Sequence, residues 1–282
     1  MAEKKFNALP GFGLTMGFTL FYLSALVLIP MGGLLIKTLG IPWKEFWELA
    51  TTDRALAAYK LTFGASAIAA LANAVFGTLL AWVLTRYEFP GRRFIDAMVD
   101  FPFALPTAVA GLTLANMFAT NGWLGQFFAR TYPDGKVEPI TLYMPWFGVV
   151  VALTFVGMPF VVRTLQPVLE SFEREVEESA ATLGAGRLRT FVSVIAPTLL
   201  PSIITGFALA FARAVGEYGS IVFISGNIPF RSEIAPQLIF IRLDEFEYSG
   251  AIALAVVLLV FSFLLLIVIN FLEQWANKFV KG

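Results

Sequence analysis

Long stretches without a charged residue dominate the chain. Six windows contain no Asp, Glu, Lys or Arg, and they cover residues 6–36, 61–85, 101–129, 139–162, 190–212 and 248–272. A helix needs about 20 apolar residues to cross a bilayer, and every window is long enough. The first window is also far longer than the ~7–15 apolar residues of a signal sequence, so we expect a retained helix at roughly 12–36. The pattern predicts an all-α, polytopic membrane bundle of six transmembrane helices.

The fifth window does not fit a simple span, because apolar residues continue well beyond it. Residues 190–230 hold only two charged residues, and one helix over most of this region would exceed ~50 Å. That is too long for a hydrocarbon core of about 30 Å and too short for two comfortable spans. Proline suits the first turn of a helix, so Pro197 and Pro201 favour a span from about Leu199 to Ser225. The alternative splits the region and gives seven spans.

The composition supports lipid as the main solvent of this chain. Apolar residues make up 58% and charged residues 14%, against a usual charged share of about 25%, and the mean hydropathy is +0.77. These values exclude a cytosolic enzyme, a secreted domain and a disordered protein. Lys+Arg and Asp+Glu are equal at 20 each, which gives no basic surplus for nucleic acid. With no Cys and no His, we expect no metal, no cofactor and no catalytic residues.

Basic residues near the ends of the predicted spans indicate the orientation. With the N-terminus inside, the inner segments hold 11 Lys and Arg and the outer segments hold 8. The positive-inside rule then places both termini on the inner, cytoplasmic side of a multi-pass membrane protein.

Two outer segments carry charges among apolar residues. Residues 41–60 contain Trp43 and Trp47 among Lys and Glu, which predicts an amphipathic interfacial helix with both indoles at headgroup depth. Residues 226–248 hold six charged residues. They are expected either to form a short helix that closes an outer gate or to be a solvated loop.

The inner connection over residues 163–190 has an ordered charge pattern. Five glutamates precede Gly184, whereas Arg187 and Arg189 follow it. Early acids and late bases suit the helix macrodipole, so we expect a helix over 169–183 that stops at Gly184-Ala185-Gly186. A second short helix over 187–195 then leads to Pro197. Two short helices joined by a glycine turn and held parallel to the membrane would form a knob, whose small residues could enter a groove on a partner.

The spacing in this connection resembles the Glu-Ala-Ala loop of ABC importer permeases. The matching residues are Glu178, Ser179, Ala180, Gly184, Val194, Ala196 and Pro197. Ser179, Val194 and Ala196 depart from the family pattern by conservative changes in size or polarity. The resemblance implies that the loop docks into a cleft of the ATP-hydrolysing subunit, through Glu178, Ser179, Ala180, Gly184 and Pro197. The alternative is a solvated amphipathic loop with chance spacing.

Further strings resemble the T-type permeases of sulfate/thiosulfate importers. They are LTRYEFPGR (84–92), PFALPTAVAGLTLA (102–115), PFVVRTLQPVLE (159–170), ARAVGEYGS (212–220) and ISGNIPF (224–230). The resemblance implies a type I permease that moves sulfate or thiosulfate by alternating access. Its implied partners are an ATPase dimer, a second, W-type permease and a periplasmic sulfate/thiosulfate-binding protein. Molybdate and tungstate permeases share several of these strings and remain the alternative within the class.

The resemblance also divides the chain into three parts. Residues 1–59 would hold a peripheral transmembrane helix and the periplasmic interfacial helix, residues 60–272 the type I transmembrane domain, and residues 273–282 a cytoplasmic tail.

Nothing in the sequence binds ATP itself. No G-x-x-x-x-G-K-[ST] string is present, so the energy must come from a separate subunit and this chain is expected to be no enzyme. A gradient-driven secondary transporter is the competing class. Such proteins usually show internal repeats and several intramembrane acids, whereas this chain shows no evident repeat.

Arg213 and Glu217 are the charged pair within the fifth predicted span. At i,i+4 they face one side of a helix, and a helix from Leu199 would place Arg213 near the middle of the bilayer. A charge there costs at least about 2.5–3.5 kcal/mol unless it is paired or wet. Two interpretations remain open. In the first, Arg213 faces the translocation path and offers positive charge to an anion, while Glu217 holds the arginine in place. In the second, the two residues form a buried pair that fixes helix packing.

Pro102 and Pro106 interrupt the third window, next to Thr107. They produce either a simple kink or a broken helix whose freed backbone groups line the path. Asp96 and Asp100 lie at the inner end of the same window, and we interpret them as interfacial charges at a helix N-terminus.

Overall fold

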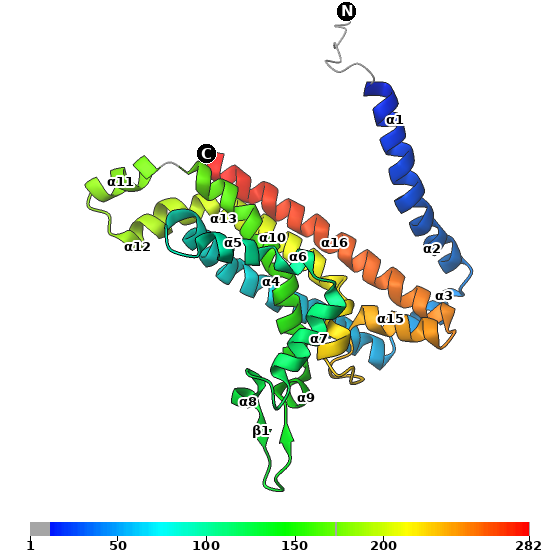
Figure 1. Cartoon of the computed structure of the whole chain (residues 1–282). Helices are drawn as coiled ribbons and strands as arrows, with labels where there is room; N and C mark the ends of the chain where they lie inside the picture. The colour runs from blue at the N-terminus through cyan, green and yellow to red at the C-terminus, as the bar shows by residue number, and fades with distance from the viewer. Residues whose placement is uncertain (1–11, 173, 282) are drawn as a thin grey trace, which may run out of the picture.

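The computed structural model describes residues 12–172 and 174–281 and is almost wholly helical. Within these residues, five helices are long and apolar enough to cross a membrane (Figure 1). They are Phe12–Leu39, Asp53–Arg86, Pro145–Ser171, Phe191–Val215 and Tyr248–Leu272. The all-α membrane bundle is confirmed, but the third predicted window supplies no continuous spanning helix.

The first half of the chain holds one N-terminal rod and one long bundle helix. Its elements are α1 (Phe12–Leu23), the π-helix η1 (Ser24–Leu28), α2 (Ile29–Leu39), α3 (Trp43–Ala50), α4 (Asp53–Arg86), α5 (Arg92–Val99), α6 (Phe101–Ala104), α7 (Thr107–Phe118), α8 (Gly125–Phe128), β1 (Arg130–Thr131), β2 (Val137–Glu138) and α9 (Ile140–Tyr143). The two strands form an antiparallel hairpin in which Arg130 lies opposite Glu138.

The second half holds the remaining bundle helices. Its elements are α10 (Pro145–Ser171), α11 (Arg174–Thr182), α12 (Arg187–Thr190), the π-helix η2 (Phe191–Ile195), α13 (Ala196–Val215), α14 (Gly219–Ile224), α15 (Ala235–Asp244) and α16 (Tyr248–Lys281). In Figure 1, α11 and α12 project at one end of the bundle and the β1–β2 hairpin at the other. We call these the α11–α12 end and the hairpin end.

Helices α4, α10 and α13 form the centre of the bundle. Leu165 and Leu169 of α10 and Leu199 of α13 are fully buried and belong to one cluster with the small face of α4. A Cβ added at Gly77 of α4 would lie 2.9 Å from a methyl group of Val161 on α10. Small residues at this contact allow the backbones to approach closely, which is how helices associate without a hydrophobic driving force in lipid.

The N-terminal rod of α1, η1 and α2 differs from every other long helix. None of its described residues is buried, and it diverges from the bundle in Figure 1. A helix that is apolar on all sides needs lipid or another apolar surface around it. The rod confirms the predicted first span and stands apart from the core.

The predicted interfacial helix over 41–60 is only partly correct. It divides into α3 and the first turns of α4, and Thr52 caps α4 by accepting a hydrogen bond from the Ala55 amide at 3.2 Å. Helix α3 buries Phe46 and Ala50 against α16, while Trp43 remains 73% exposed. The chain therefore forms two helices, because Thr52 begins a new helix directly after the end of α3. The pattern of Trp and charged residues alone did not reveal this N-cap.

The predicted third span is wrong as a single helix. The window begins with the four-residue α6, continues through Leu105 and Pro106 in extended backbone, and then forms α7, which ends at Phe118. A residue before proline avoids helical backbone, which explains the extended Leu105. The segment is therefore a broken helix, and the simple-kink alternative is excluded.

The predicted bounds of the fifth span are also wrong. The helix runs from Phe191 to Val215 through Pro197 and Pro201. The π-helix η2 precedes Pro197, which lies at the start of α13, where the missing amide does no harm. The break comes later, at Gly216–Tyr218, and α14 has only six residues. The region supplies neither the predicted 199–225 helix nor a second span.

Two predicted domain boundaries fall inside helices. The 59/60 boundary lies within α4, and the 272/273 boundary lies within α16, which continues to Lys281. No break in secondary structure marks either boundary.

Candidate coupling loop and broken-helix site

The loop between α10 and α13 contains two short helices, as predicted, but their bounds differ. Helix α10 continues to Ser171, Phe172 is extended, and α11 begins only at Arg174, so the predicted single helix over 169–183 is wrong at its start. Helix α12 ends at Thr190 and continues directly into η2. Together, α12 and η2 cover the predicted 187–195 helix. We call residues 172–190 the α11–α12 loop.

Gly184 ends α11 in the way the sequence predicts. Its φ is +81°, a left-handed backbone that glycine adopts without strain. The Leu183 amide donates to the Ser179 carbonyl at 3.2 Å, and the Ala185 amide donates to the Ala180 carbonyl at 3.0 Å. These bonds satisfy carbonyls that the helix end would otherwise leave free.

The exposed face of this loop is available to a partner. Glu178 and Ser179 are exposed, Ala180 is partly buried, and Leu183 at the tip is 88% exposed. Pro197, the last residue of the motif, is exposed beyond η2 at the first turn of α13. The motif residues therefore lie at the α11–α12 end, on the loop and at the root of the helix that follows it.

Arg86 ties the base of this loop to the bundle, a role that the sequence reasoning missed. Its guanidinium lies 5.5 Å from the ring centroid of Trp82 and 5.6 Å from that of Phe172. It also donates to the Phe172 carbonyl at 3.2 Å. The contact holds the break between α10 and α11 against the end of α4. The signal was an arginine four residues after a tryptophan, at the end of a charge-free window.

A second arginine, Arg163 of α10, binds two aspartates, Asp96 of α5 and Asp100 directly after it. Arg163 binds Asp100 through Nε and Nη2 at 2.8 and 2.6 Å, and Asp96 through Nη1 at 2.7 Å. The Gln166 amide also donates to Asp96 at 2.9 Å. The hydrogen bond from Gln166, and then that from Arg163, lowers the pKa of Asp96 although burial opposes it. The two aspartates are thus ion-pair partners of Arg163. Asp100 also lies at the N-cap position of α6, as expected, although its side chain caps no backbone amide, whereas Asp96 lies within α5 and not at its N-terminus.

The two breaks in the bundle meet each other at the hairpin-end half. A Cβ added at Gly111 of α7 would lie 2.2 Å from the Ser220 carbonyl of α14, and one at Gly219 would lie 2.3 Å from Thr107 Oγ1. Backbones this close need glycine at both positions. The broken third window therefore crosses α14 directly, with Thr107 at the contact.

The prolines of the third window differ in their surroundings. Pro102, at the start of α6, is buried, whereas Pro106, immediately before α7, is exposed and Thr107 is partly buried. Pro106 thus initiates α7 at the crossing, and Pro102 lies on the other side of the break.

Arg213 and Glu217 join the end of α13 to the start of α14. Arg213 Nη1 lies 2.5 Å from Glu217 Oε2. The other oxygen of Glu217 accepts hydrogen bonds from the Ser220 amide and hydroxyl at 2.9 and 3.0 Å. The Glu217 side chain is 2% exposed and that of Arg213 is 35% exposed. The acid is therefore fully engaged, while part of the guanidinium remains accessible.

The predicted depth of Arg213 needs correction. Because the helix begins at Phe191 instead of Leu199, Arg213 lies about 33 Å along it. It belongs to the last turn of α13, toward the hairpin end, and not to the middle of a span.

A third arginine pair was also missed. Arg54, in the first turn of α4, donates through Nε and Nη2 to the two oxygens of Glu233 at 2.7 and 2.6 Å. Glu233 is buried and precedes α15, whose Ala235 amide donates to Thr62 Oγ1 at 2.8 Å. The pair is 179 residues apart, so no local spacing could reveal it. Helix α15 confirms a short helix within the predicted segment 226–248.

Comparisons with known proteins agree with this architecture. Residues 73–278 match the family described as binding-protein-dependent transport system inner membrane component. The match covers more than half of the chain, and the chain belongs to this family of ABC importer permeases. It is therefore a transport component of a membrane and not an enzyme.

Individual relatives extend the likeness over almost the whole chain. The sulfate transport system permease protein CysT of Salmonella typhimurium is 46% identical over 282 residues, covering 100% of this chain and 99% of the relative. The protein of the same name from Synechocystis is 49% identical and covers 93% of this chain and 90% of the relative.

Solved structures show the same fold at much lower identity. A bacterial ABC transporter that imports the acidic polysaccharide alginate aligns with a TM-score of 0.74 at 15% identity, over 93% of this chain and 94% of that one. The methionine transporter MetNI in an inward-facing conformation aligns with a TM-score of 0.52 at 13% identity, over 80% and 99%. Both confirm the type I permease fold.

Proposed function

We propose that this chain is the T-type permease of an ATP-driven importer that moves sulfate, and thiosulfate by the same route, across the bacterial inner membrane. The assignment of sulfate as the cargo rests on one observation, the 46% identity to a sulfate transport system permease over the full 282 residues. Residues 60–272 form most of the transporting domain, the N-terminal rod of α1, η1 and α2 is peripheral to it, and the end of α16 from residue 273 extends beyond it.

The proposed orientation places the α11–α12 end in the cytoplasm together with both termini. An ATPase dimer docks on the exposed loop face of Glu178, Ser179 and Leu183, and a W-type permease supplies the other half of the path. A periplasmic sulfate/thiosulfate-binding protein delivers cargo at the hairpin end. A second structure of a bacterial alginate ABC transporter, which aligns with a TM-score of 0.68, contains the transporter in complex with a substrate-bound periplasmic protein, and this supports the arrangement.

A continuous helical path supports coupling between the loop and the broken helices. Helix α12, η2 and α13 follow one another without a gap from Arg187 to Val215. Movement of the α11–α12 loop would therefore be carried along one rod to Arg213 and, through Glu217, to α14. Arg86, which holds Phe172, would act as the pivot at the base of the loop.

Arg213 is the residue that we propose to meet the anion. Its side chain is 35% exposed, and it lies where α13 ends and the crossing of α7 and α14 begins. Glu217 neutralises it in part, which suits a path that must release its cargo as well as receive it. Pro102 and Pro106 break the third window so that Thr107 and its neighbours line the same path.

Co-expression with an ATPase and a second permease tests this function. The purified complex would be placed in liposomes with the binding protein, and ATP hydrolysis measured with sulfate and with molybdate. We expect stimulation by the sulfate-loaded protein and none with molybdate. Stimulation by molybdate alone would overturn the cargo, and a chain that binds no ATPase would overturn the importer itself.

Gly184→Asp tests the coupling loop, because a side chain at φ +81° is strained and the α11 end would shift. We expect uptake to be abolished and the ATPase to dissociate more readily, while insertion into the membrane is retained. Gly186→Asp adds the same charge two residues away at a glycine with ordinary φ and open space, so it should keep most of the uptake. Normal uptake by Gly184→Asp would contradict the coupling role.

A further inference from the structure

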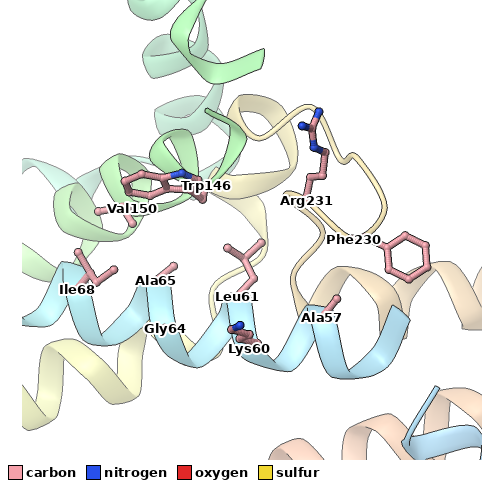
Figure 2. Close-up of a pocket in the computed structure, with 10 residues that line it drawn as sticks. All are labelled: Ala57, Lys60, Leu61, Gly64, Ala65, Ile68, Trp146, Val150, Phe230 and Arg231. Carbon is pink, nitrogen blue, oxygen red and sulfur yellow. The ribbon is translucent and has the colours of Figure 1, made fainter. Parts of the chain in front are cut away.

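Helices α4 and α10 are in close contact along one part of their length and separate along another. The close contact is at Gly77, where an added Cβ would lie 2.9 Å from a methyl group of Val161. Toward the hairpin end, a cavity of about 500 Å³ opens between the same two helices. Figure 2 shows Ala65 of α4 facing Trp146 and Val150 of α10 across this space. The pair of helices therefore has a tight end and an open end.

An asparagine side chain lies where α4, α10 and α13 meet. Asn73 of α4 is 2% exposed, and its Nδ2 has no hydrogen-bond partner among the described residues. A Cβ added at Gly157 of α10 would lie 2.5 Å from this nitrogen and 3.4 Å from the Cβ of Ala210 on α13. The amide thus occupies the space that a side chain at Gly157 would need. A buried donor without a partner costs free energy, so its presence requires an explanation.

The same face of α4 carries two more buried polar atoms without a hydrogen-bond partner in the described part of the chain. They are Tyr59 Oη and Ser66 Oγ, and with Asn73 they recur every seven residues, about two helical turns. Thr62 on this face is matched, because its Oγ1 accepts a hydrogen bond from the Ala235 amide of α15 at 2.8 Å. The present packing therefore satisfies the buried face of α4 at one level and leaves three polar groups on it unpaired.

Helix α10 is weakened and open to hydrogen bonding beside the Asn73 amide. Pro159 lies inside the helix, two residues after Gly157, and it has no amide to donate to the Phe155 carbonyl. At Gly157 no side chain covers the backbone of α10. A helix carbonyl that already accepts one hydrogen bond retains a second lone pair. The amide of Asn73 thus lies against a deformable stretch of helix that offers acceptors.

We propose that Asn73 is a positioning residue for transport, at a joint about which α4 rocks on α10. Its amide is unpaired in the arrangement described here. It donates to the backbone of α10 in a second arrangement, in which the helices approach at their open end and the cavity becomes smaller. Small movements of packed helices of this kind occur in shear transitions. The unpaired amide raises the free energy of the first arrangement relative to the second, which keeps both accessible during a cycle. The coupling of this movement to ATP rests on the proposed function.

The unfolding temperature of the full-length chain in detergent tests whether the amide is unpaired. Asn73→Leu removes the polar group at similar volume, so the unfolding temperature should rise by about 2–4 °C. Thr62→Val is the matched control on the same face of α4. It should lower the temperature, because it leaves the buried Ala235 amide without its acceptor. An Asn73→Leu chain that unfolds at or below the wild-type temperature would overturn the proposal.

The assembled complex tests the second arrangement. The difference in unfolding temperature between Asn73→Leu and wild type should have opposite signs without nucleotide and with a non-hydrolysable ATP analogue. The kcat of sulfate uptake should fall about tenfold with little change in KM. Asn73→Ser keeps a donor and should retain more uptake than Asn73→Ala.

A residue that only fills space would shift the unfolding temperature in the same direction in both nucleotide states and would leave the Ser and Ala variants equal. Either result would overturn the joint. A wild-type complex that neither hydrolyses ATP nor moves sulfate would instead overturn the proposed function, and the chain alone would still decide whether the amide is unpaired.

Discussion

Two buried glutamates, each paired with a partly exposed arginine, do different work in this bundle. Glu233 receives two bonds from Arg54, a residue 179 positions away, and so fixes the turn before α15 to the start of α4. Glu217 receives one contact from Arg213 and two hydrogen bonds from Ser220. Arg54 binds both oxygens of Glu233 with two N–H groups of its guanidinium. In the second pair, both oxygens of Glu217 have partners, but part of the Arg213 guanidinium remains accessible.

Exposure of the arginine side chain is a poor guide to the role of each pair. The exposed fractions are similar, at 27% for Arg54 and 35% for Arg213. What separates them is geometry, because a bidentate pair between distant segments stabilises tertiary structure while a local i,i+4 pair positions a break. We therefore expect the Arg54 pair to govern stability and the Arg213 pair to govern transport.

The largest effect should come from Arg54→Ala, which leaves Glu233 buried without its partner. Removing one member of a buried pair costs up to about 3–5 kcal/mol, so the detergent-solubilised protein should unfold at a clearly lower temperature. The double variant Arg54→Ala, Glu233→Gln removes the stranded charge and should recover part of the loss. An Arg54→Ala variant that unfolds at the wild-type temperature would contradict the stabilising role that distinguishes the Arg54 pair from the Arg213 pair.

A smaller effect is expected where the second pair meets the crossing of α7 and α14. In Gly219→Ala the new Cβ would lie 2.3 Å from Thr107 Oγ1, and overpacking of this kind costs about 1–3 kcal/mol. Thermal unfolding and uptake should both decline. Gly216→Ala is the matched control, since nothing lies within 4 Å of its Cβ, and it should behave as wild type. If Gly219→Ala and Gly216→Ala had the same unfolding temperature and uptake, the close contact between α7 and α14 would not be required.

The smallest effect concerns Arg163, because its partners Asp96 and Asp100 are partly exposed and exposed, respectively, and neither is buried. The pKa of Asp96 is lowered by Gln166 and Arg163. A lowered folded-state pKa gives stability that is present above the unfolded value of about 3.9 and lost as the pH falls through the folded value. Asp96→Asn should therefore cost at most about 1 kcal/mol at pH 7, and the cost should decline below about pH 3.9 and disappear only below the lowered folded-state pKa of Asp96. The unfolding temperatures of both proteins across this range provide the check, and a difference that grows toward low pH would refute it.

The sequence predicted the parts of the fold that depend on local pattern. Charge-free windows identified the five long helices of the described residues, and the acid-to-base order around Gly184 identified a loop of two short helices joined by a glycine turn. Each signal lies within one stretch of chain, because a spanning helix satisfies its own backbone and a glycine cap needs only its own turn.

The sequence failed where distant contacts or context decided the outcome. Pro197 and Pro201 suggested a helix start, but η2 lets the helix continue, and the break falls at Gly216–Tyr218. The partners of Arg54, Arg86 and Arg163 lie 179, 86 and 63 residues away. Periodicity cannot report such distances, so the site at the α7–α14 crossing emerged only in three dimensions.

Uptake of labelled sulfate by the assembled complex with Arg213→Ala shows whether Arg213 contributes to the translocation path. ATP hydrolysis and unfolding temperature would be measured on the same preparation. We predict that uptake falls at least tenfold, while assembly is retained and the unfolding temperature drops less than in Arg54→Ala. Wild-type uptake by a folded, assembled Arg213→Ala complex would contradict the claim and leave the Arg213–Glu217 pair a packing feature only.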